Sequence, residues 1–306
     1  SEVGDHFGIV DVAALGGEDL MNTDTVLYDH PGPKALRRNR ILTVIFAAAL
    51  TAILLWIVVV FAQKGQWDAT LWSPFLDSST WLDFILPGLA YTVGTAALAT
   101  VLSLIMGILL AVGRLSDHRW VSVPAGACVE FFRAVPLLIM IFFIFFALPY
   151  LLGGPISAFW CVVAGLTLYN GSVLAEAFRS GIQSVPKGQS DAALALGMRK
   201  SGVMRFVLLP QAMRLMLPVI VGQLVVIVKD TALGYIVALP ELMQRGVNDL
   251  SANYGNVVAA AIVVAAIYIA INTALTKTAE YLDRRSQRGR KKADVEPSFE
   301  LMEPQG

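Results

Sequence analysis

Residues 176–212 read EAFRSGIQSVPKGQSDAALALGMRKSGVMRFVLLPQA and interrupt an otherwise apolar sequence. This stretch is basic on balance and contains several residues that break helices. The charged residues are Glu176, Arg179, Lys187, Asp191, Arg199, Lys200 and Arg205, and the breaks fall at Gly181, Pro186, Gly188, Gly197 and Pro210. Such sequence belongs in water, and an excess of basic residues marks the cytoplasmic side of a membrane protein. We therefore expect a cytoplasmic loop between membrane helices.

A short helix is predicted inside this loop, from residue 190 to residue 197. Ser190 can cap its start, Asp191 suits the positive end of the helix dipole, and Gly197 can end the helix with a positive φ. A helix of one or two turns is not stable alone in water. Its small and apolar side chains therefore indicate that it docks into a groove on another protein. These side chains belong to Ala193, Ala195 and Leu196.

The spacing of residues in this loop resembles the EAA loop of ABC-importer permeases. The matching pattern is Asp191-Ala192-Ala193, three residues, Gly197, nine residues, Val207, one residue and Leu209-Pro210. The flanking sequences GIQSVPKGQ and LPQA are similar to the amino-acid branch of that family. Asp191 departs from the usual glutamate of the family but keeps the acidic head of the helix. The alternative for this stretch is a generic basic loop between two membrane helices.

The resemblance implies a role for the loop and a set of partners. In the family, a cytosolic ATPase dimer binds the loop, a second permease subunit pairs with the first, and an extracellular binding protein delivers the substrate. The implied coupling residues are Ser190, Asp191, Ala192, Ala193, Leu196 and Gly197. VLYDHPGPK, at residues 26–34, is also similar to the N-terminal segment of glutamate-type permeases of high-GC Gram-positive bacteria.

Composition indicates an integral membrane protein. Of 306 residues, 56% are hydrophobic and 15% are charged, whereas a soluble domain carries about a quarter charged residues. The mean hydropathy is +0.66. Cys128 and Cys161 lie in apolar sequence and give neither a disulfide framework nor a metal-ligand spacing. We expect the lipid bilayer as a partner, no metal site and no nucleic acid.

Uncharged runs predict an all-α membrane protein with six transmembrane helices and both ends in the cytoplasm. Basic residues precede the first run and follow the last, which places both ends inside by the positive-inside rule. The predicted parts are a tail at 1–40 (with Met21 as a second candidate start), a helix at 41–62, an external loop at 63–83, a permease domain at 84–282 with its cytoplasmic loop at 179–211, and a basic tail at 283–306. Spans of the domain are expected at 84–113, on both sides of a turn at 149–155, from 215 and at 250–276, with a second external loop at 241–253. The first helix would be an addition to a five-helix type I importer core.

A candidate gate lies at residues 131–138, FFRAVPLL. This segment looks like the Arg-x-x-Pro-Leu-Leu segment of the family. The resemblance implies a gate element in which Arg133 lies near the translocation path and Pro136 lets the helix bend. The alternative is that Arg133 extends along the membrane surface to the lipid headgroups.

Lys229 and Asp230 form the ionisable pair at membrane depth. Lys229 lies about 25 Å from Ala212 if the segment between them is helical. An ionisable residue at that depth costs at least ~2.5–3.5 kcal/mol unless it faces a cavity or a partner. Thr231 can cap a new half-helix, and a broken helix with a charge at the break is typical of transporter binding sites. The segment also resembles the substrate path of amino-acid permeases, while the alternative is a self-neutralising structural pair.

The sequence contains no motif for chemistry of its own. It has no P-loop, no HExxH and no GxSxG. We therefore expect no enzyme activity and no bound cofactor, with ATP used by the partner subunit. The prediction is a permease subunit of the bacterial plasma membrane that imports a polar amino acid, with glutamate favoured, by alternating access. The alternatives are a self-sufficient ion-coupled carrier or channel, and a structural membrane anchor.

Overall fold

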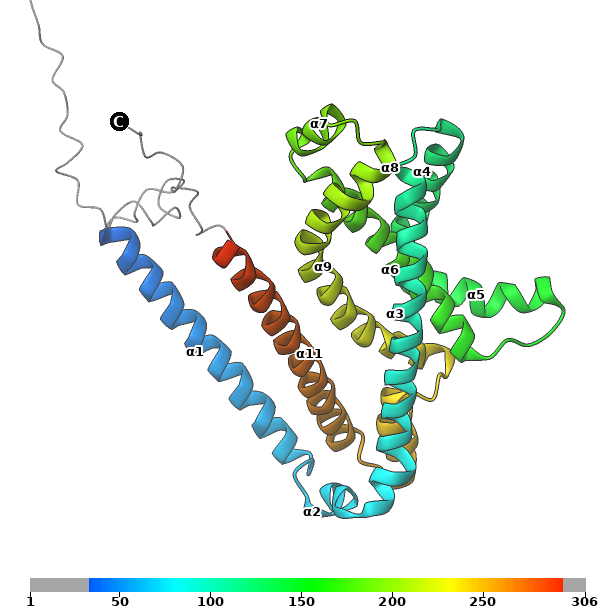
Figure 1. Cartoon of the computed structure of the whole chain (residues 1–306). Helices are drawn as coiled ribbons and strands as arrows, with labels where there is room; N and C mark the ends of the chain where they lie inside the picture. The colour runs from blue at the N-terminus through cyan, green and yellow to red at the C-terminus, as the bar shows by residue number, and fades with distance from the viewer. Residues whose placement is uncertain (1–32, 294–306) are drawn as a thin grey trace, which may run out of the picture. The chain divides into compact units, whose positions relative to one another are not determined.

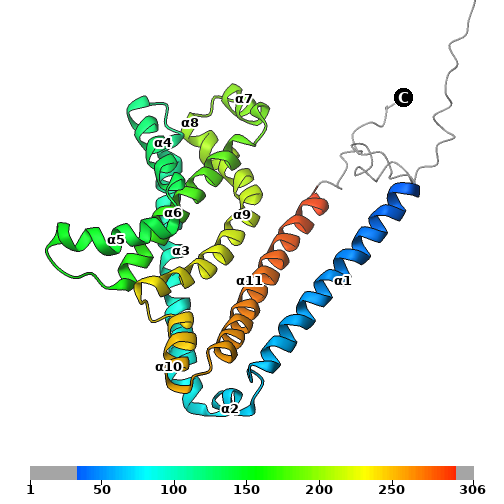
Figure 2. The same cartoon turned by 180° about the vertical axis from the view of Figure 1, so that it is seen from behind.

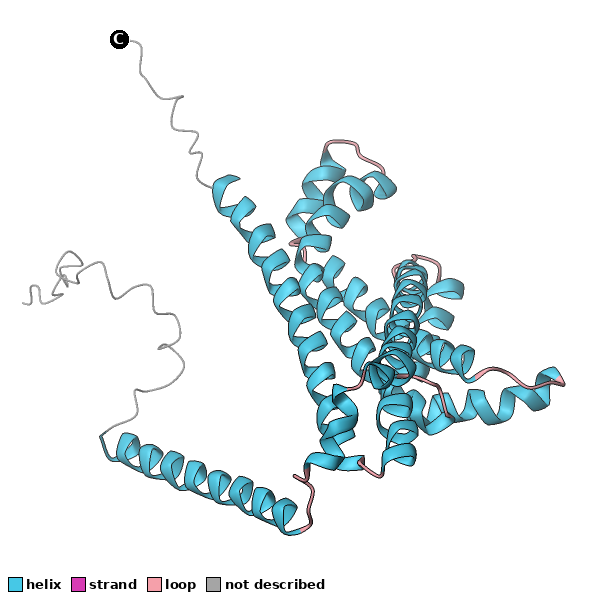
Figure 3. Cartoon of the chain, turned by 90° about the horizontal axis from the view of Figure 1, so that it is seen from below, coloured by secondary structure: helices cyan, strands magenta, loops and turns pink. Residues whose placement is uncertain are grey.

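The structure is a computed structural model that describes residues 33–293. Residues 1–32 of the predicted tail at 1–40, and residues 294–306 of the predicted tail at 283–306, lie outside this range. The described elements are helices joined by short loops, and no strand occurs among them (Figure 3). The predicted all-α fold is thereby confirmed. The chain divides into two units, residues 1–65 and 66–306.

The first unit contains α1, Pro33–Gln63, a helix of 31 residues. At ~1.5 Å per residue it is long enough to cross a hydrocarbon core of about 30 Å. Its apolar side chains are exposed along most of its length in this chain. A helix that is apolar on all sides requires lipid or other protein around it. The predicted helix at 41–62 lies inside α1.

The second unit consists of long helices with short helical connections. The long helices are α3 (Leu86–Arg114), α4 (Arg119–Ala134), α5 (Leu137–Leu152), α6 (Ala158–Gln183), α9 (Leu209–Asp230) and α11 (Val257–Ala293). The short ones are α2 (Ala69–Trp72), η4 (Ser73–Leu76), η5 (Thr80–Ile85), α7 (Lys187–Ala195), α8 (Lys200–Gly202), η6 (Val203–Leu208), η7 (Thr231–Val237), η8 (Gln244–Asp249) and α10 (Leu250–Tyr254). Across both units, five helical segments are long and apolar enough to cross a membrane, and the number is six if the bent pair α4 and α5 is one broken span rather than a re-entrant loop.

α3 and α6 form the centre of the second unit. A Cβ added to Gly107 on α3 would lie 2.9 Å from the Cβ of Leu174 on α6, so the glycine allows the two backbones to approach closely, as small residues do between membrane helices. α4, α5 and α9 pack against α6, and α11 packs against α9. A buried apolar cluster joins α3, α6 and α9: Ala111, Leu174, Phe178, Val185, Ala212 and Met216.

Different elements occupy the two ends of the second unit. α7 and α8 lie at one end with the start of α4, and α2 and α10 lie at the opposite end (Figures 1 and 2). The predicted external loop at 63–83 is mostly helical, because it contains α2, η4 and η5. The indole N–H groups of Trp72 and Trp81 donate to the carbonyls of Gln66 and Phe75, at 3.0 and 2.8 Å. These two hydrogen bonds therefore stabilise the fold of the connection between residues 66 and 81.

The long uncharged run is split into two helices as predicted. α5 ends where Gly153 adopts a φ of +73°, a conformation that favours glycine. α4, however, was not predicted as a helix. It meets α5 at an angle of 99°, across a break at Val135 and Pro136.

The predicted start of the last span, Leu250, is wrong. Residues 244–254 form η8 and α10, and α11 begins only at Val257. Gly255, with a φ of +65°, ends α10 and lets the chain turn into α11. The second predicted external loop, at 241–253, is therefore largely helical.

Candidate functional site

α7 carries the predicted coupling residues, but it begins earlier than predicted. The helix spans Lys187–Ala195 and has Pro186 at its N-cap. Ser190 lies inside the helix, where its hydroxyl donates to the Lys187 carbonyl at 3.0 Å, and Asp191 lies beyond the first turn. The predicted capping by Ser190 is wrong, because proline disfavours helix in the residue before it and the helix begins directly after Pro186.

Gly197 follows the end of α7 in the predicted conformation. Its φ is +81°, in the left-handed region that glycine enters without penalty. The N–H of Gly197 donates to the Leu194 carbonyl at 2.9 Å, and the N–H of Met198 donates to the Ala193 carbonyl at 3.2 Å. These two bonds form a Schellman motif, which satisfies carbonyls that a helix end otherwise leaves unpaired.

The side chains of α7 divide between two faces. Ala193 is 6% exposed and lies where α7 packs against η6, so it supports the helix rather than presenting a surface to a partner. Leu194 is 44% exposed and Leu196 is 85% exposed. Of the other predicted coupling residues, Asp191, Ala192 and Gly197 are exposed and Ser190 is half-buried.

An exposed ion pair joins the far side of this loop to the turn between α3 and α4. Lys200 Nζ, at the start of α8, lies 2.8 Å from Asp117 Oδ2. The hydrogen bond from Lys200, followed by its positive charge, lowers the pKa of Asp117 below its ordinary value. The two side chains are 77% and 73% exposed, so the pair orients the loop but adds little to stability.

Glu176 lies at the centre of an ion-pair cluster where α3, α4 and α6 meet. Its Oε2 lies 2.6 Å from Arg114 Nη1 on α3 and 3.2 Å from Arg179 Nε on α6. Arg133 Nη1 on α4 lies 3.9 Å from the same oxygen. The side chains of Glu176 and Arg114 are 24% and 14% exposed, so the cluster is partly buried. One carboxylate thus faces guanidinium groups from three helices.

Arg133 and Pro136 lie on the two sides of the elbow between α4 and α5. Arg133 is in the last turn of α4, and Pro136 is the N-cap of α5. The sequence therefore marked the place where the helix bends. Neither the gate interpretation nor the headgroup interpretation included the contact between Arg133 and Glu176, because the two residues lie far apart in the sequence.

Lys229, Asp230 and Thr231 lie where α9 passes into η7. Lys229 is exposed, Asp230 is half-buried and Thr231 is fully buried. The Thr231 hydroxyl donates to the Val228 carbonyl at 2.7 Å, so it does not cap a new half-helix. The predicted break is instead a tightening from α-helix to 3-10 helix, because the chain keeps helical dihedral angles through Thr231.

The predicted pair of Lys229 and Asp230 does not form a close ion pair. Among the described side chains, no hydrogen bond or ion pair involves either residue. Adjacent residues on a helix do not face each other, which is why the two charges stay apart. Lys229 is therefore an exposed cation with no carboxylate oxygen within 4.0 Å among the described side chains.

Glu241 is a fully buried carboxylate near the opposite end of the unit. It accepts hydrogen bonds from the backbone N–H groups of Met243 and Gln244, at 2.8 and 2.9 Å, and from the Tyr268 hydroxyl at 2.8 Å. Burial raises the pKa of Glu241, and these hydrogen bonds oppose that effect. The carboxylate thus joins the turn before η8 to α11.

Sequence reasoning missed this carboxylate. The available signal was an acidic residue directly after Pro240 and shortly before a helix, a pattern typical of helix starts. A third helix joins the same site, because the Thr92 hydroxyl on α3 accepts from the Leu242 N–H at 3.0 Å.

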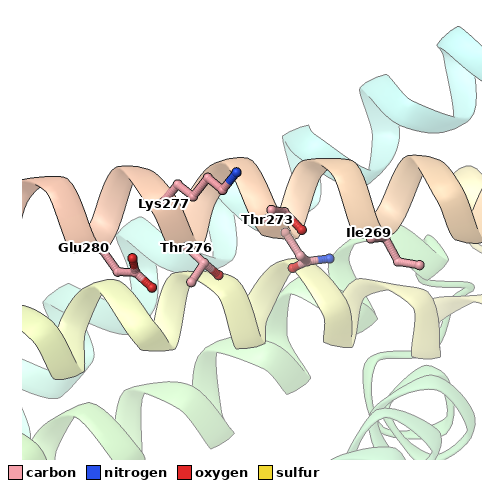
Figure 4. Close-up of a pocket in the computed structure, with 6 residues that line it drawn as sticks. Ile269, Thr273, Thr276, Lys277 and Glu280 are labelled. Atoms are coloured by element: carbon pink, nitrogen blue, oxygen red, sulfur yellow. The ribbon is translucent and has the colours of Figure 1, made fainter.

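An open groove runs along α11, apart from the predicted site residues. Its lining consists of Ile269, Asn272, Thr273, Thr276, Lys277 and Glu280 (Figure 4). None of the predicted coupling, gate or substrate-path residues lines it. Among the described residues, no group of three or more histidines, cysteines, aspartates or glutamates could hold a metal ion.

Comparison with known proteins agrees with the sequence pattern. Residues 103–288 match the family described as "Binding-protein-dependent transport system inner membrane component". The glutamate transport system permease protein GluD of Corynebacterium glutamicum is 43% identical over 234 residues, which cover 76% of this chain and 85% of that protein. The arginine transport system permease protein ArtQ of Bacillus subtilis is 33% identical over 204 residues, which cover 67% and 93%.

A solved structure supports the fold. The crystal structure of an amino acid ABC transporter with histidines aligns with a TM-score of 0.64 at 27% identity, covering 69% of this chain and 98% of that one. The predicted type I importer fold is confirmed by this likeness.

Proposed function

Because this chain belongs to the family of binding-protein-dependent transport system inner membrane components, we propose that it is the permease subunit of an importer for a polar amino acid, with glutamate as its substrate. The chain is the transport component, and the ATPase is a separate subunit. Glutamate is favoured because GluD, at 43% identity, is a glutamate permease. No described feature favours the alternative of a self-sufficient carrier or channel.

The observation that carries the proposal is the exposed surface of α7. This helix of nine residues presents Leu194 and Leu196, which are 44% and 85% exposed, and a Schellman motif fixes its end. An ATPase subunit that binds these leucines would displace α7 when it moves. The displacement would reach the transmembrane helices through Val185, which is 5% exposed and packs in the apolar cluster of α3, α6 and α9.

Charge supports an orientation with α7 in the cytoplasm. Basic residues outnumber acidic ones at the α7 end. The basic residues are Arg114, Arg119, Arg133, Arg179, Lys187, Arg199, Lys200, Arg205 and Arg214, and the acidic ones are Asp117, Glu130, Glu176 and Asp191. Acidic residues prevail at the α2 end: Asp68, Asp77, Asp83, Glu241 and Asp249, with Arg245. By the positive-inside rule, the α7 end faces the ATPase and the α2 end faces outward, where an amino-acid-binding protein would deliver substrate.

Lys229 is the residue we assign to the substrate path, with Asp230 and Thr231 beside it. It is exposed and lies at membrane depth, where an ammonium facing lipid is costly. A second permease subunit, identical or paralogous, would enclose a path along this face of α9. There the ammonium would attract a carboxylate of an acidic amino acid, while Arg133 and Pro136 form the candidate gate.

Reconstitution tests the proposal. The chain is coexpressed with its ATPase and second permease subunit, placed in liposomes with the binding protein outside, and supplied with radiolabelled glutamate, aspartate, glutamine or arginine. We expect glutamate uptake that requires ATP and the binding protein, and no ATP hydrolysis by the isolated chain. Uptake without the ATPase would overturn the permease role. ATP-driven uptake of a different amino acid alone would overturn only the glutamate assignment.

A further inference from the structure

The chain makes ion pairs with α3, α4 or the turn between them both before α7, at Glu176, and after α7, at Lys200. Glu176 lies about two turns before the end of α6 at Gln183, and it contacts Arg114 at the end of α3 and Arg133 near the end of α4. Lys200, at the start of α8 and after α7, pairs with Asp117 in the turn between α3 and α4. A displacement of α7 would therefore act on α4 from two directions.

The three guanidinium groups on Glu176 have different mechanical roles. Arg114 joins α6 to α3, and Arg133 joins α6 to α4. Arg179 lies three residues after Glu176 on the same helix, so its ion pair joins α6 only to itself. The same carboxylate thus makes two contacts between helices and one contact within a helix.

The elbow beside Arg133 lacks the bonds that would keep a helix straight. Pro136 has no N–H to donate, and its carbonyl accepts from Met140 as the first bond of α5, at 3.1 Å. The last bond on the α4 side runs from the Val135 N–H to the Phe131 carbonyl at 3.2 Å. With no helical bond across the break, a change in the angle between α4 and α5 disrupts no backbone ladder.

We propose that Glu176 is a positioning residue that passes movement of α7 to the elbow between α4 and α5 through Arg133. The proposal rests on the function assigned to α7 above. α6 is one continuous helix from Ala158 to Gln183, so a shift at its loop end moves Glu176. Arg133 follows the carboxylate, and the elbow is the point at which α5 is redirected. Closure of the ATPases would thereby change the membrane part of the subunit.

Two substitutions separate this role from simple charge balance. Arg133→Gln and Arg179→Gln each remove one positive charge from the same carboxylate. We expect Arg133→Gln to lower the amount of amino acid imported per ATP hydrolysed by about fivefold or more, while ATPase copurification and basal hydrolysis stay normal. Arg179→Gln, the matched control, should stay within about twofold of the wild type because its contact lies within one helix.

Which of the two variants has the larger coupling defect separates the positioning role of Arg133 from charge balance at Glu176. Arg179 lies closer to Glu176 than Arg133 does, so a role in charge balance alone predicts the larger defect for Arg179→Gln. Arg133→Lys keeps the charge and should retain coupling. Adding Arg133→Gln to Glu176→Gln should lower coupling no further, because both changes remove one interaction.

Several outcomes would overturn the proposal. One is equal coupling in Arg133→Gln and Arg179→Gln. Another is that the defects of Arg133→Gln and Glu176→Gln add up in the double variant. A third is that the Arg133→Gln protein, but not the Arg179→Gln protein, is missing from the membrane, which would assign Arg133 to folding. Failure of the wild-type chain to assemble with an ATPase would instead overturn the proposed function, so the two failures are distinguishable.

Discussion

The hydroxyl of Tyr268 on α11 donates a hydrogen bond of 2.8 Å to Glu241 Oε2, in the turn before η8. Glu241 is fully buried, and its two oxygens also accept from backbone N–H groups of its own turn. A single carboxylate therefore fixes the connection between α9 and α11 at the end of the unit opposite to α7.

Substitutions at this contact should destabilise the protein to different degrees. Tyr268→Phe removes one hydrogen bond of three and should lower the free energy of unfolding by about 1 kcal/mol. Glu241→Gln turns an NH₂ group toward a backbone N–H and leaves a buried donor without an acceptor, which costs about 1–3 kcal/mol. Thermal unfolding in detergent measures both. Asn248→Ala, which loses an exposed hydrogen bond to Gln244, should change little. Wild-type stability of Glu241→Gln would contradict the assigned role.

The same carboxylate predicts a dependence of stability on pH. Burial raises the pKa of Glu241 above its ordinary 4.5, so the folded protein binds this proton more tightly than the unfolded chain. Its contribution to stability is therefore full below the ordinary pKa and is lost as pH rises through the folded pKa. Between pH 4.5 and the pKa of Glu241 in the folded protein, the Tm of the wild type should fall more steeply with rising pH than the Tm of Glu241→Gln. Parallel profiles would show that Glu241 does not titrate in this range.

Leu196 should be required for binding of the ATPase. It is 85% exposed on the surface of α7, and a carboxylate in a desolvated apolar contact is costly. We expect Leu196→Glu to reduce copurification of the ATPase about tenfold or more while membrane levels stay normal. Leu76→Glu is the matched control, because Leu76 is 88% exposed at the opposite end. Retained ATPase binding in Leu196→Glu would remove α7 as the docking surface.

Substitutions at Gly197 should follow the cost of its backbone conformation. With a φ of +81° and no atom within 4 Å of an added Cβ, the penalty is conformational and amounts to about 1–2 kcal/mol for alanine. Gly197→Asn should be milder because asparagine tolerates this region. Gly197→Asp should be the worst for uptake, because its carboxylate also opposes the C-terminal end of the helix dipole. Gly188→Ala, with open space and no positive φ, is the control. Normal uptake by Gly197→Asp would argue against α7 as the coupling element.

Lys229→Met separates a substrate ligand from a structural charge. If Lys229 binds substrate, uptake should be lost while the complex assembles and its ATPase still responds to the binding protein. If the charge is structural, Lys229→Met removes the positive charge next to the half-buried Asp230, the protein fails to accumulate, and adding Asp230→Leu restores it. Lys277→Met, at an exposed position on α11, is the control. Uptake restored in the double variant would exclude both residues from substrate binding.

Local signals predicted much of this structure. Apolar runs marked the long helices, the turn at 149–155 marked the break between two of them, and Gly197 marked a helix end with a positive φ, because these features depend only on neighbouring residues. Ser190 was misassigned as a cap because two start signals compete and Pro186 comes first. The buried contacts were beyond reach: Arg114 and Glu176 are 62 positions apart, and only the packing of α3 on α6 brings them together.

The backbone amides at the end of α7 can report whether this helix is open or closed. The amide protons of Gly197 and Met198 are held by the Leu194 and Ala193 carbonyls, although the glycine itself is exposed. They can exchange with deuterated solvent only when the last turn of α7 unwinds. The rate of deuterium uptake at these two positions therefore measures local opening of the helix, and its slowing would register a docked partner without any label on the protein.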